Sequence, residues 1–318
     1  PITETVDLPF ASKVRSTHNG VDVGVMHACG HDGHTTMLLG AAEALVARED
    51  ITGTVHFIFQ PAEETSGGGR VMVEEGLFEI FPCDAVFAMH NWPGLKAGDI
   101  AVQPGPMMAS VDTFTIALNG YGGHAAMPEK ACDPITASAE LILALQTIVS
   151  RKLNPQDPAV VSVTAIKGGE AFNVIPDSVH IKGTVRCFSP DVREKIKAEI
   201  ETIAHAIGTA HGIDAVFQFI EGYPSTINTP REAAFAAKIA CALTSDAQVQ
   251  TQFRPSMASE DFSFMLQQVP GAYIWLGAGE TAAPLHNPHF DFNDDLLLTG
   301  ADLLTELAVN FLRDYPDI

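Results

Sequence analysis

The densest cluster of metal-binding residue types lies in the segment 27–34, HACGHDGH, which is punctuated by glycines. Cysteine and histidine are the side chains that zinc and similar metals prefer as ligands. A Cys-Gly-His spacing in an irregular loop can direct Cys29 and His31 toward one ion. The other two histidines, His27 and His34, are interpreted as structural or supporting residues. Asp32 is interpreted as a residue that could orient a ligand from behind. The alternative is a glycine loop with surface histidines and a buried cysteine.

Adjacent carboxylates form a second candidate group at Glu63 and Glu64, directly after the apolar run 53–60, GTVHFIFQ. This run predicts a buried strand. Adjacent carboxylates can divide two tasks, because one can ligate a metal while the other acts as general base. The alternative is a pair of acids that favours the start of a helix. The position of this pair directly after a predicted strand favours a ligand-binding site, because ligands bind beyond the carboxyl ends of strands in an open α/β sheet.

The same reasoning selects two histidines further along the chain. His90 closes the predicted buried strand 84–90, and His286 follows the predicted buried strand 271–277. A lone histidine is more often structural than a ligand, so the interpretation depends on the whole set. That set exceeds what one tetrahedral ion needs and suits two ions roughly 3.5–4 Å apart that share a bridging ligand. The five candidate metal ligands are Cys29, His31, Glu64, His90 and His286.

Three further polar residues stand out in the middle of the chain. His124 lies in a glycine-rich turn, GYGGHAAMP, which is either a flexible loop or a means of delivering a histidine to a distant active site. Asn173 lies in a second polar turn. Arg186 interrupts an apolar strand segment, where an arginine invites a carboxylate partner. That partner is either a substrate or an internal acid.

The elements that must position these residues indicate an α/β fold with two domains. Helical and buried-strand patterns alternate in the first third and return after residue 223, where helices are predicted at 230–243, 259–268 and 294–313. This alternation predicts a mostly parallel sheet. The middle follows the order β-α-β-β-α-β, the ferredoxin-like split pattern. We therefore predict a catalytic α/β domain formed by 1–108 and 223–318, interrupted by a ferredoxin-like lid or dimerisation domain at 109–222.

Composition excludes several classes of function. The 318 residues, 46% of them hydrophobic, suffice for roughly two domains. A net charge of −21 would repel phosphate backbones, so nucleic-acid binding is not expected. No run of 18 apolar residues is present, so no membrane partner is expected either. Five scattered cysteines favour a reducing, cytoplasmic location over a disulfide framework.

Seven segments in order resemble one known family over essentially the whole chain. The family is the metal-dependent amidohydrolases of the aminoacylase, hippurate hydrolase and auxin-conjugate hydrolase group, a branch of the aminoacylase and carboxypeptidase superfamily. The segments are MHACGHDGHT, FIFQPAEE, AMHNWPG, GYGGHAAMP, FNVIPD, ASEDF and LHNPHFD. The resemblance implies metal-dependent hydrolysis of the amide bond of N-acyl amino acids or short peptides. It also implies two divalent ions per subunit, for which zinc, manganese, cobalt and nickel all suit the mixed donor set.

The resemblance assigns roles to individual residues. It implies that the five candidate ligands hold the metals and that Glu63 is the general base. His124 matches a histidine that reaches the partner subunit's active site, so a homodimer through the inserted domain is expected. Asn173 and Arg186 match positions that contact the substrate carboxylate. Glu260 belongs to a motif near the site and receives no assigned role.

One departure from the family pattern concerns the start of the chain. Family members carry an Asp-Met-Asp segment just before a stretch that resembles Pro1–Glu4, and here the chain begins after it. We therefore expect a fragment that lacks the first strands of the catalytic domain. One alternative function is then an inactive binding or dimerisation module, and another is a different dimetal hydrolase such as a dipeptidase or deacetylase. Phosphate substrates rank low, because no glycine-rich phosphate loop is present.

Overall fold

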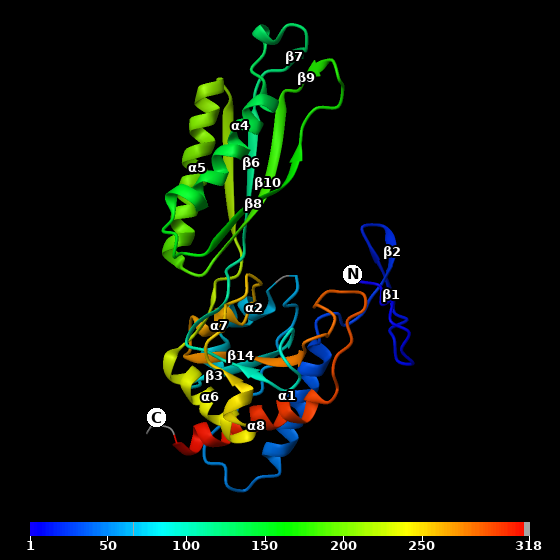
Figure 1. Cartoon of the computed structure of the whole chain (residues 1–318), viewed down its shortest axis with the longest axis vertical. Coiled ribbons are helices and arrows are strands. Elements are labelled where there is room, and N and C mark those ends of the chain that lie inside the picture. Colours follow the sequence, from blue (N-terminus) through cyan, green and yellow to red (C-terminus); the bar gives the residue numbers. More distant parts are fainter. Residues whose placement is uncertain (66, 315–318) are drawn as a thin grey trace. The chain divides into compact units, whose positions relative to one another are not determined.

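The computed structural model describes residues 1–65 and 67–314, and the chain divides into two compact units (Figure 1). Each unit has its own architecture and is described by itself. Unit 1 comprises Pro1–Met107, Ile227–Arg254 and Phe264–Ile318. Unit 2 comprises Met108–Thr226 and Pro255–Ser263.

Unit 2 is built on a four-stranded antiparallel sheet with the strand order β11-β6-β10-β8. Its two long helices, α4 and α5, lie together on one face of this sheet (Figure 1). The opposite face carries no helix from the described part of the chain. In chain order the elements are β6 (Asp112–Asn119), α4 (Pro134–Thr147), β8 (Ala159–Lys167), β10 (Ser178–Cys187), α5 (Pro190–His211) and β11 (Asp214–Glu221).

Side chains that alternate along the strands form the core of unit 2. In β6, Phe114, Ile116 and Leu118 are buried beneath the helices, while the residues between them face outward. Gly183 of β10 lies opposite Phe114, and a Cβ at this position would meet the Phe114 ring at 2.2 Å. The glycine is therefore needed for the aromatic ring to lie flat against the sheet. Asp133 begins α4, because its carboxylate accepts hydrogen bonds from two backbone N–H groups of the first turn.

Unit 1 contains a second four-stranded sheet with the order β13-β4-β14-β3. The long strands β3 (Val86–Pro93) and β14 (Gly271–Gly279) pair in parallel, as do β13 (Val249–Gln250) and β4 (Ile100–Ala101). The pairing of β14 with β4 is antiparallel, so the sheet is mixed. The structure thus has a mixed sheet where a mostly parallel one was predicted, with parallel pairing between its two long strands.

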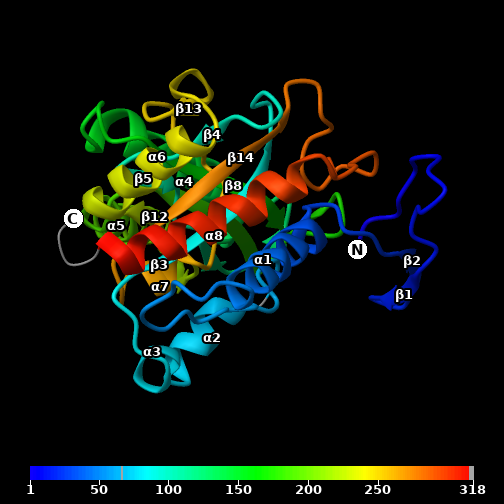
Figure 2. The same cartoon turned by 90° about the horizontal axis from the view of Figure 1, so that it is seen from below.

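Three helices cover one face of this sheet. Helices α1 (His31–Val46) and α8 (Leu296–Asp314) lie side by side, with α6 (Pro230–Leu243) beyond them (Figure 2). Met37 of α1 and Leu303 of α8 are buried in this core with Met89 and Ile274 of the sheet. The burial of these side chains positions the start of α1 beside the carboxyl end of β3. No helix in the described ranges is both long and apolar enough to cross a membrane.

Shorter elements complete unit 1 and its borders. Hairpin β1–β2 precedes the first helix, and two small helices follow the acidic pair Glu63–Glu64. The elements are β1 (Arg15–His18), β2 (Val21–Gly24), α2 (Gly68–Glu74), α3 (Leu77–Ile80), β5 (Gly105–Met108), β12 (Thr226–Asn228) and α7 (Ser263–Leu266).

Two predicted elements differ in the structure. The segment 53–60 forms no strand, and its side chains are at most half-buried. A strand requires a hydrogen-bonded neighbour, and in the described ranges β3 pairs only with β14. The predicted helix 259–268 shortens to α7, because the Glu260 carboxylate accepts a hydrogen bond from the Phe262 N–H and closes a local turn instead.

Candidate metal centre

The loop before α1 places a thiol and an imidazole on either side of one glycine. Gly30 has a left-handed backbone with φ of +86°, and a Cβ there would meet Asn91 Oδ1 at 2.3 Å. Only glycine fits this conformation and this contact. Cys29 is buried just before it, and His31 is the first residue of α1. The loop thus fixes both side chains at the N-terminus of the helix.

His90 lies on β3 and faces this loop. Its Nε2 is 3.4 Å from Cys29 Sγ, and its Nδ1 donates a hydrogen bond to the Asn91 carbonyl at 2.7 Å. This bond leaves the Nε2 lone pair directed toward the cysteine, which is the tautomer a metal ligand needs. Burial lowers the pKa of His90 to about 4, so the ring is neutral near pH 7.

The acidic pair and His286 complete the cluster on two strained loops. Ala62 and His286 have φ of 54° and 62°, a left-handed conformation that is costly for residues with a Cβ and is concentrated at functional sites. His286 Nε2 lies 2.9 Å from Glu64 Oε1. His31 Nε2 lies 3.9 Å from a carboxylate oxygen of both Glu63 and Glu64.

These side chains converge tightly enough to hold metal ions. Their potential ligand atoms fall into three overlapping groups, and within each group all atoms lie within 4.8 Å of one another. All five predicted ligands and Glu63 belong to these groups. Burial, followed by the charge of His90, lowers the pKa of His31, which also favours a neutral ligand. The groups are Cys29–His31–His90, Cys29–Glu64–His286 and His31–Glu63–Glu64.

Of the two predicted supporting residues, only Asp32 lies outside the groups of potential ligands. Asp32 is exposed on the first turn of α1 and belongs to none of the ligand groups found among the described residues. Glu260 is buried in unit 2, where its carboxylate accepts the hydrogen bond from Phe262. The residues that do lie behind the ligands are His34 and Asn91, and sequence reasoning did not select Asn91. Its position directly after His90 was the available signal.

The three candidate residues of unit 2 lie in two separate places, His124 with Asn173 and Arg186 apart from them. His124 lies on β7 (Gly123–His124), which pairs with β9 (Val174–Ile175), and the Asn173 carbonyl accepts a hydrogen bond from Ala125 at 3.1 Å. Arg186 lies near the other end of β10, eight residues beyond Ser178. At about 3.3 Å per residue these ends are roughly 26 Å apart. Within one chain, Asn173 and Arg186 therefore do not meet on one small substrate.

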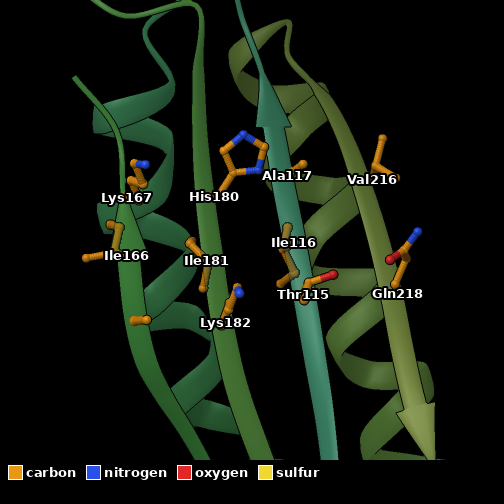
Figure 3. Close-up of a pocket in the computed structure, with 11 residues that line it drawn as sticks. Thr115, Ile116, Ala117, Ile166, Lys167, His180, Ile181, Lys182, Val216 and Gln218 are labelled. Atoms are coloured by element: carbon orange, nitrogen blue, oxygen red, sulfur yellow. The ribbon is translucent and has the colours of Figure 1, made fainter. Parts of the chain in front are cut away.

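Arg186 belongs to the face of the unit 2 sheet that carries no helix. Its Nη1 donates to Thr184 Oγ1 and to the Val185 carbonyl, and no carboxylate lies within ion-pair distance of it among the described residues. Burial lowers the pKa of Arg186. Figure 3 shows His180 and Lys182 of the same strand on this face, beside a shallow depression of about 440 Å³. His180, Lys182 and Arg186 alternate with buried residues along β10 and make this face of the sheet basic.

The arrangement of a thiol, imidazoles and paired carboxylates defines a metal-dependent hydrolase, and comparison with known proteins places the chain in a family of this kind. The chain matches Peptidase family M20/M25/M40 over residues 1–310. It belongs to that family.

Relatives and solved structures agree with this assignment. The chain is 42% identical to a hippurate hydrolase of Campylobacter jejuni, covering 98% of this chain and 79% of the relative. It is 39% identical to an N-acetylcysteine deacetylase of Bacillus subtilis, with the same two coverages. The crystal structure of a dinuclear metal-binding M20 peptidase from Bacillus subtilis superimposes with a TM-score of 0.82 at 35% identity, covering 98% of this chain and 78% of that one. This likeness supports the predicted mixed α/β fold.

Proposed function

We propose that this protein is a dimetal amidohydrolase that cleaves the amide bond of N-acyl amino acids. The observation that carries this proposal is the convergence of Cys29, His31, Glu64, His90 and His286 with Glu63 beside them. The named activities of the hippurate hydrolase and N-acetylcysteine deacetylase relatives, both of which act on N-acyl amino acids, support the substrate class.

The donor set suits two divalent ions, for which zinc, manganese, cobalt and nickel are candidates. Cys29 occurs in two of the three ligand groups, as do His31 and Glu64, so neighbouring ions can share this set. When bound, the ions would supply the Lewis acidity that polarises the scissile carbonyl and lowers the pKa of a water. The similarity to a dinuclear metal-binding M20 peptidase supports this number of ions.

In this proposal Glu63 moves the proton. Its side chain is 18% exposed and touches the ligand His31 at 3.9 Å, so it borders the metal set while keeping contact with solvent. As general base it takes a proton from the attacking water and later passes that proton to the leaving amine. The neighbouring Glu64 is engaged with His286, which leaves the two carboxylates with different tasks.

Unit 2 acts in this proposal as a ferredoxin-like lid and dimerisation domain inserted at 109–222 between the catalytic segments 1–108 and 223–318. Its element order and strand order support this assignment. Arg186, which forms no ion pair with any described residue, binds the substrate carboxylate. His124 stabilises the developing oxyanion, and Asn173 lies beside it. Because these two lie far from Arg186 along β10, we infer a homodimer in which two copies supply the two groups.

The proposal also includes a cellular location and two partners. No disulfide joins any of the five cysteines in the described part of the chain, and a cytoplasmic location remains a prediction. The partners proposed are a small N-acyl amino acid and a second copy of this chain, and Glu260 remains a candidate supporting residue.

An assay of the metal-loaded chain tests the function. The purified protein is incubated with N-benzoyl and N-acetyl amino acids and, as a contrast, with phosphate esters. We expect release of free amino acid that disappears in Cys29→Ser and is unchanged in the surface variant Glu49→Gln. Metal content measured in parallel should approach two ions per chain. Turnover of phosphate esters alone, or a chain that takes up metal but cleaves no amide, would contradict the proposal.

A further inference from the structure

The two chain segments that carry Cys29 and His90 are joined by a polar contact behind the ligands. Asn91 follows His90 on β3 and is 1% exposed, and His34 lies in the first turn of α1. The Asn91 N–H donates to His34 Nε2 at 2.9 Å, and the Asn91 side-chain amide lies 2.6 Å from the same nitrogen. Positions 57 residues apart in the sequence therefore meet next to the metal ligands.

Asn91 uses both of its backbone polar groups at this junction. Its carbonyl accepts the Nδ1–H of His90, which orients the ligand ring, while its N–H reaches His34. The side-chain oxygen as placed faces His34 Nε2, and the amide nitrogen has no partner among the described residues. Because the single Nε2 lone pair accepts the Asn91 N–H, that backbone bond is the hydrogen bond that joins the two residues, and the side-chain amide packs beside it.

His34 extends the junction into the cysteine loop. Its backbone N–H donates to the Gly30 carbonyl at 3.0 Å, and Gly30 separates Cys29 from His31. The Asn91 side chain fits against Gly30 only because that residue has no Cβ. A continuous chain of hydrogen bonds thus runs from the His90 ring through Asn91 and His34 to the loop that presents the other two ligands.

We propose that His34 and Asn91 are positioning residues that hold the Cys29–His31 loop and His90 at the spacing a metal ion requires. The inference rests on the proposed metal centre and deepens it. Ligand atoms placed within 4.8 Å before binding lose less conformational freedom when the ion arrives. Polar groups behind metal ligands typically contribute about 10–100-fold in metal affinity. His34 itself is not proposed to touch the ion.

The test compares His34→Phe with His34→Gln in the full chain. Phenylalanine fills the space without an acceptor, whereas the glutamine amide can reach the position of Nε2 and accept the Asn91 N–H. Cobalt(II) affinity is measured by competition with a chromophoric chelator, and the visible absorption of the bound ion reports the geometry. Leu303→Ala, a core change in α8 of the same unit, controls for loss of stability alone.

We expect His34→Phe to bind cobalt(II) about 10–100-fold more weakly with an altered spectrum. His34→Gln should recover most of both properties, and Leu303→Ala should keep the wild-type spectrum. Wild-type affinity and spectrum in His34→Phe would overturn this inference and leave the proposed function standing. The same loss in Leu303→Ala would also overturn it, because stability alone would then explain the effect. A wild-type chain that takes up no cobalt(II) would overturn both.

Discussion

His286 and Ala28 are joined by a backbone hydrogen bond of 2.7 Å between the His286 N–H and the Ala28 carbonyl. The bond connects the loop after β14 to the residue just before Cys29, across most of the sequence. It fixes the left-handed backbone of His286, whose φ is 62°. The ring is thereby presented to Glu64, so the most exposed of the candidate ligands still has a defined place.

Replacing the proposed general base should separate metal binding from turnover. Glu63→Gln keeps the shape of the side chain but cannot accept a proton, so kcat on an N-acyl amino acid should fall about 10²–10⁴-fold. The metal content should remain that of the wild type, because the role proposed for Glu63 is proton transfer rather than metal binding. Metal analysis and steady-state kinetics on the same preparation check both parts. Near-normal turnover would remove Glu63 from this role.

Replacing the neighbouring carboxylate, Glu64, should lower metal binding, in contrast to replacing Glu63. Glu64 contacts His286 at 2.9 Å and shares a ligand group with Cys29. Glu64→Ala should therefore lower the number of bound ions per chain, and activity should fall in proportion to the ion lost. Addition of excess metal should restore part of the activity in Glu64→Ala and none in Glu63→Gln. Equal rescue of the two variants would mean that the carboxylates are not functionally distinct.

The candidate ligands could be selected from the sequence because their chemistry is local. Cys29 and His31 are separated by one glycine, and His90 lies at the end of an apolar run that does form β3. The strand expected before Glu63 is not formed, so that residue was selected through a wrong intermediate step. Its position instead depends on the loop that begins at Ala62, whose positive φ no sequence pattern indicated.

Long-range contacts account for what could not be predicted. The junction of His34 with Asn91 depends on how α1 packs against β3, which neither segment specifies alone. The separation of Arg186 from Asn173 has a simpler origin, because the length of β10 sets it.

The carboxylate-binding role of Arg186 predicts a selective kinetic defect. Arg186→Met should lower kcat/KM on N-acyl amino acids about 10–100-fold, since a charge-assisted hydrogen bond contributes roughly 1.5–3 kcal/mol. Cleavage of an N-acyl amine without a carboxylate should change little. Lys195→Gln, which removes an exposed charge from α5, serves as the control for net charge. An equal loss on both substrates would indicate a structural arginine instead.

The ion pair between Asp112 and Arg193 predicts a stability change confined to unit 2. Asp112 is fully buried, and its carboxylate accepts from Arg193 Nε at 2.9 Å, from a second guanidinium nitrogen and from the Gly222 N–H. Arg193→Met leaves this carboxylate buried without its cation, so the free energy of unfolding should fall by about 3–5 kcal/mol.

The matched control is Lys197→Met on the same helix. Lys197 pairs with Glu221 at 3.1 Å near the surface, where such pairs contribute about 0–1 kcal/mol. Denaturant unfolding followed by circular dichroism measures both variants, and the metal content of each checks that unit 1 is intact. If Arg193→Met were no more destabilising than Lys197→Met, the buried pair would not hold α5 against β6. Restoring stability with Arg193→Met combined with Asp112→Asn would identify the unpaired charge as the cause, because the neutral amide needs no cation.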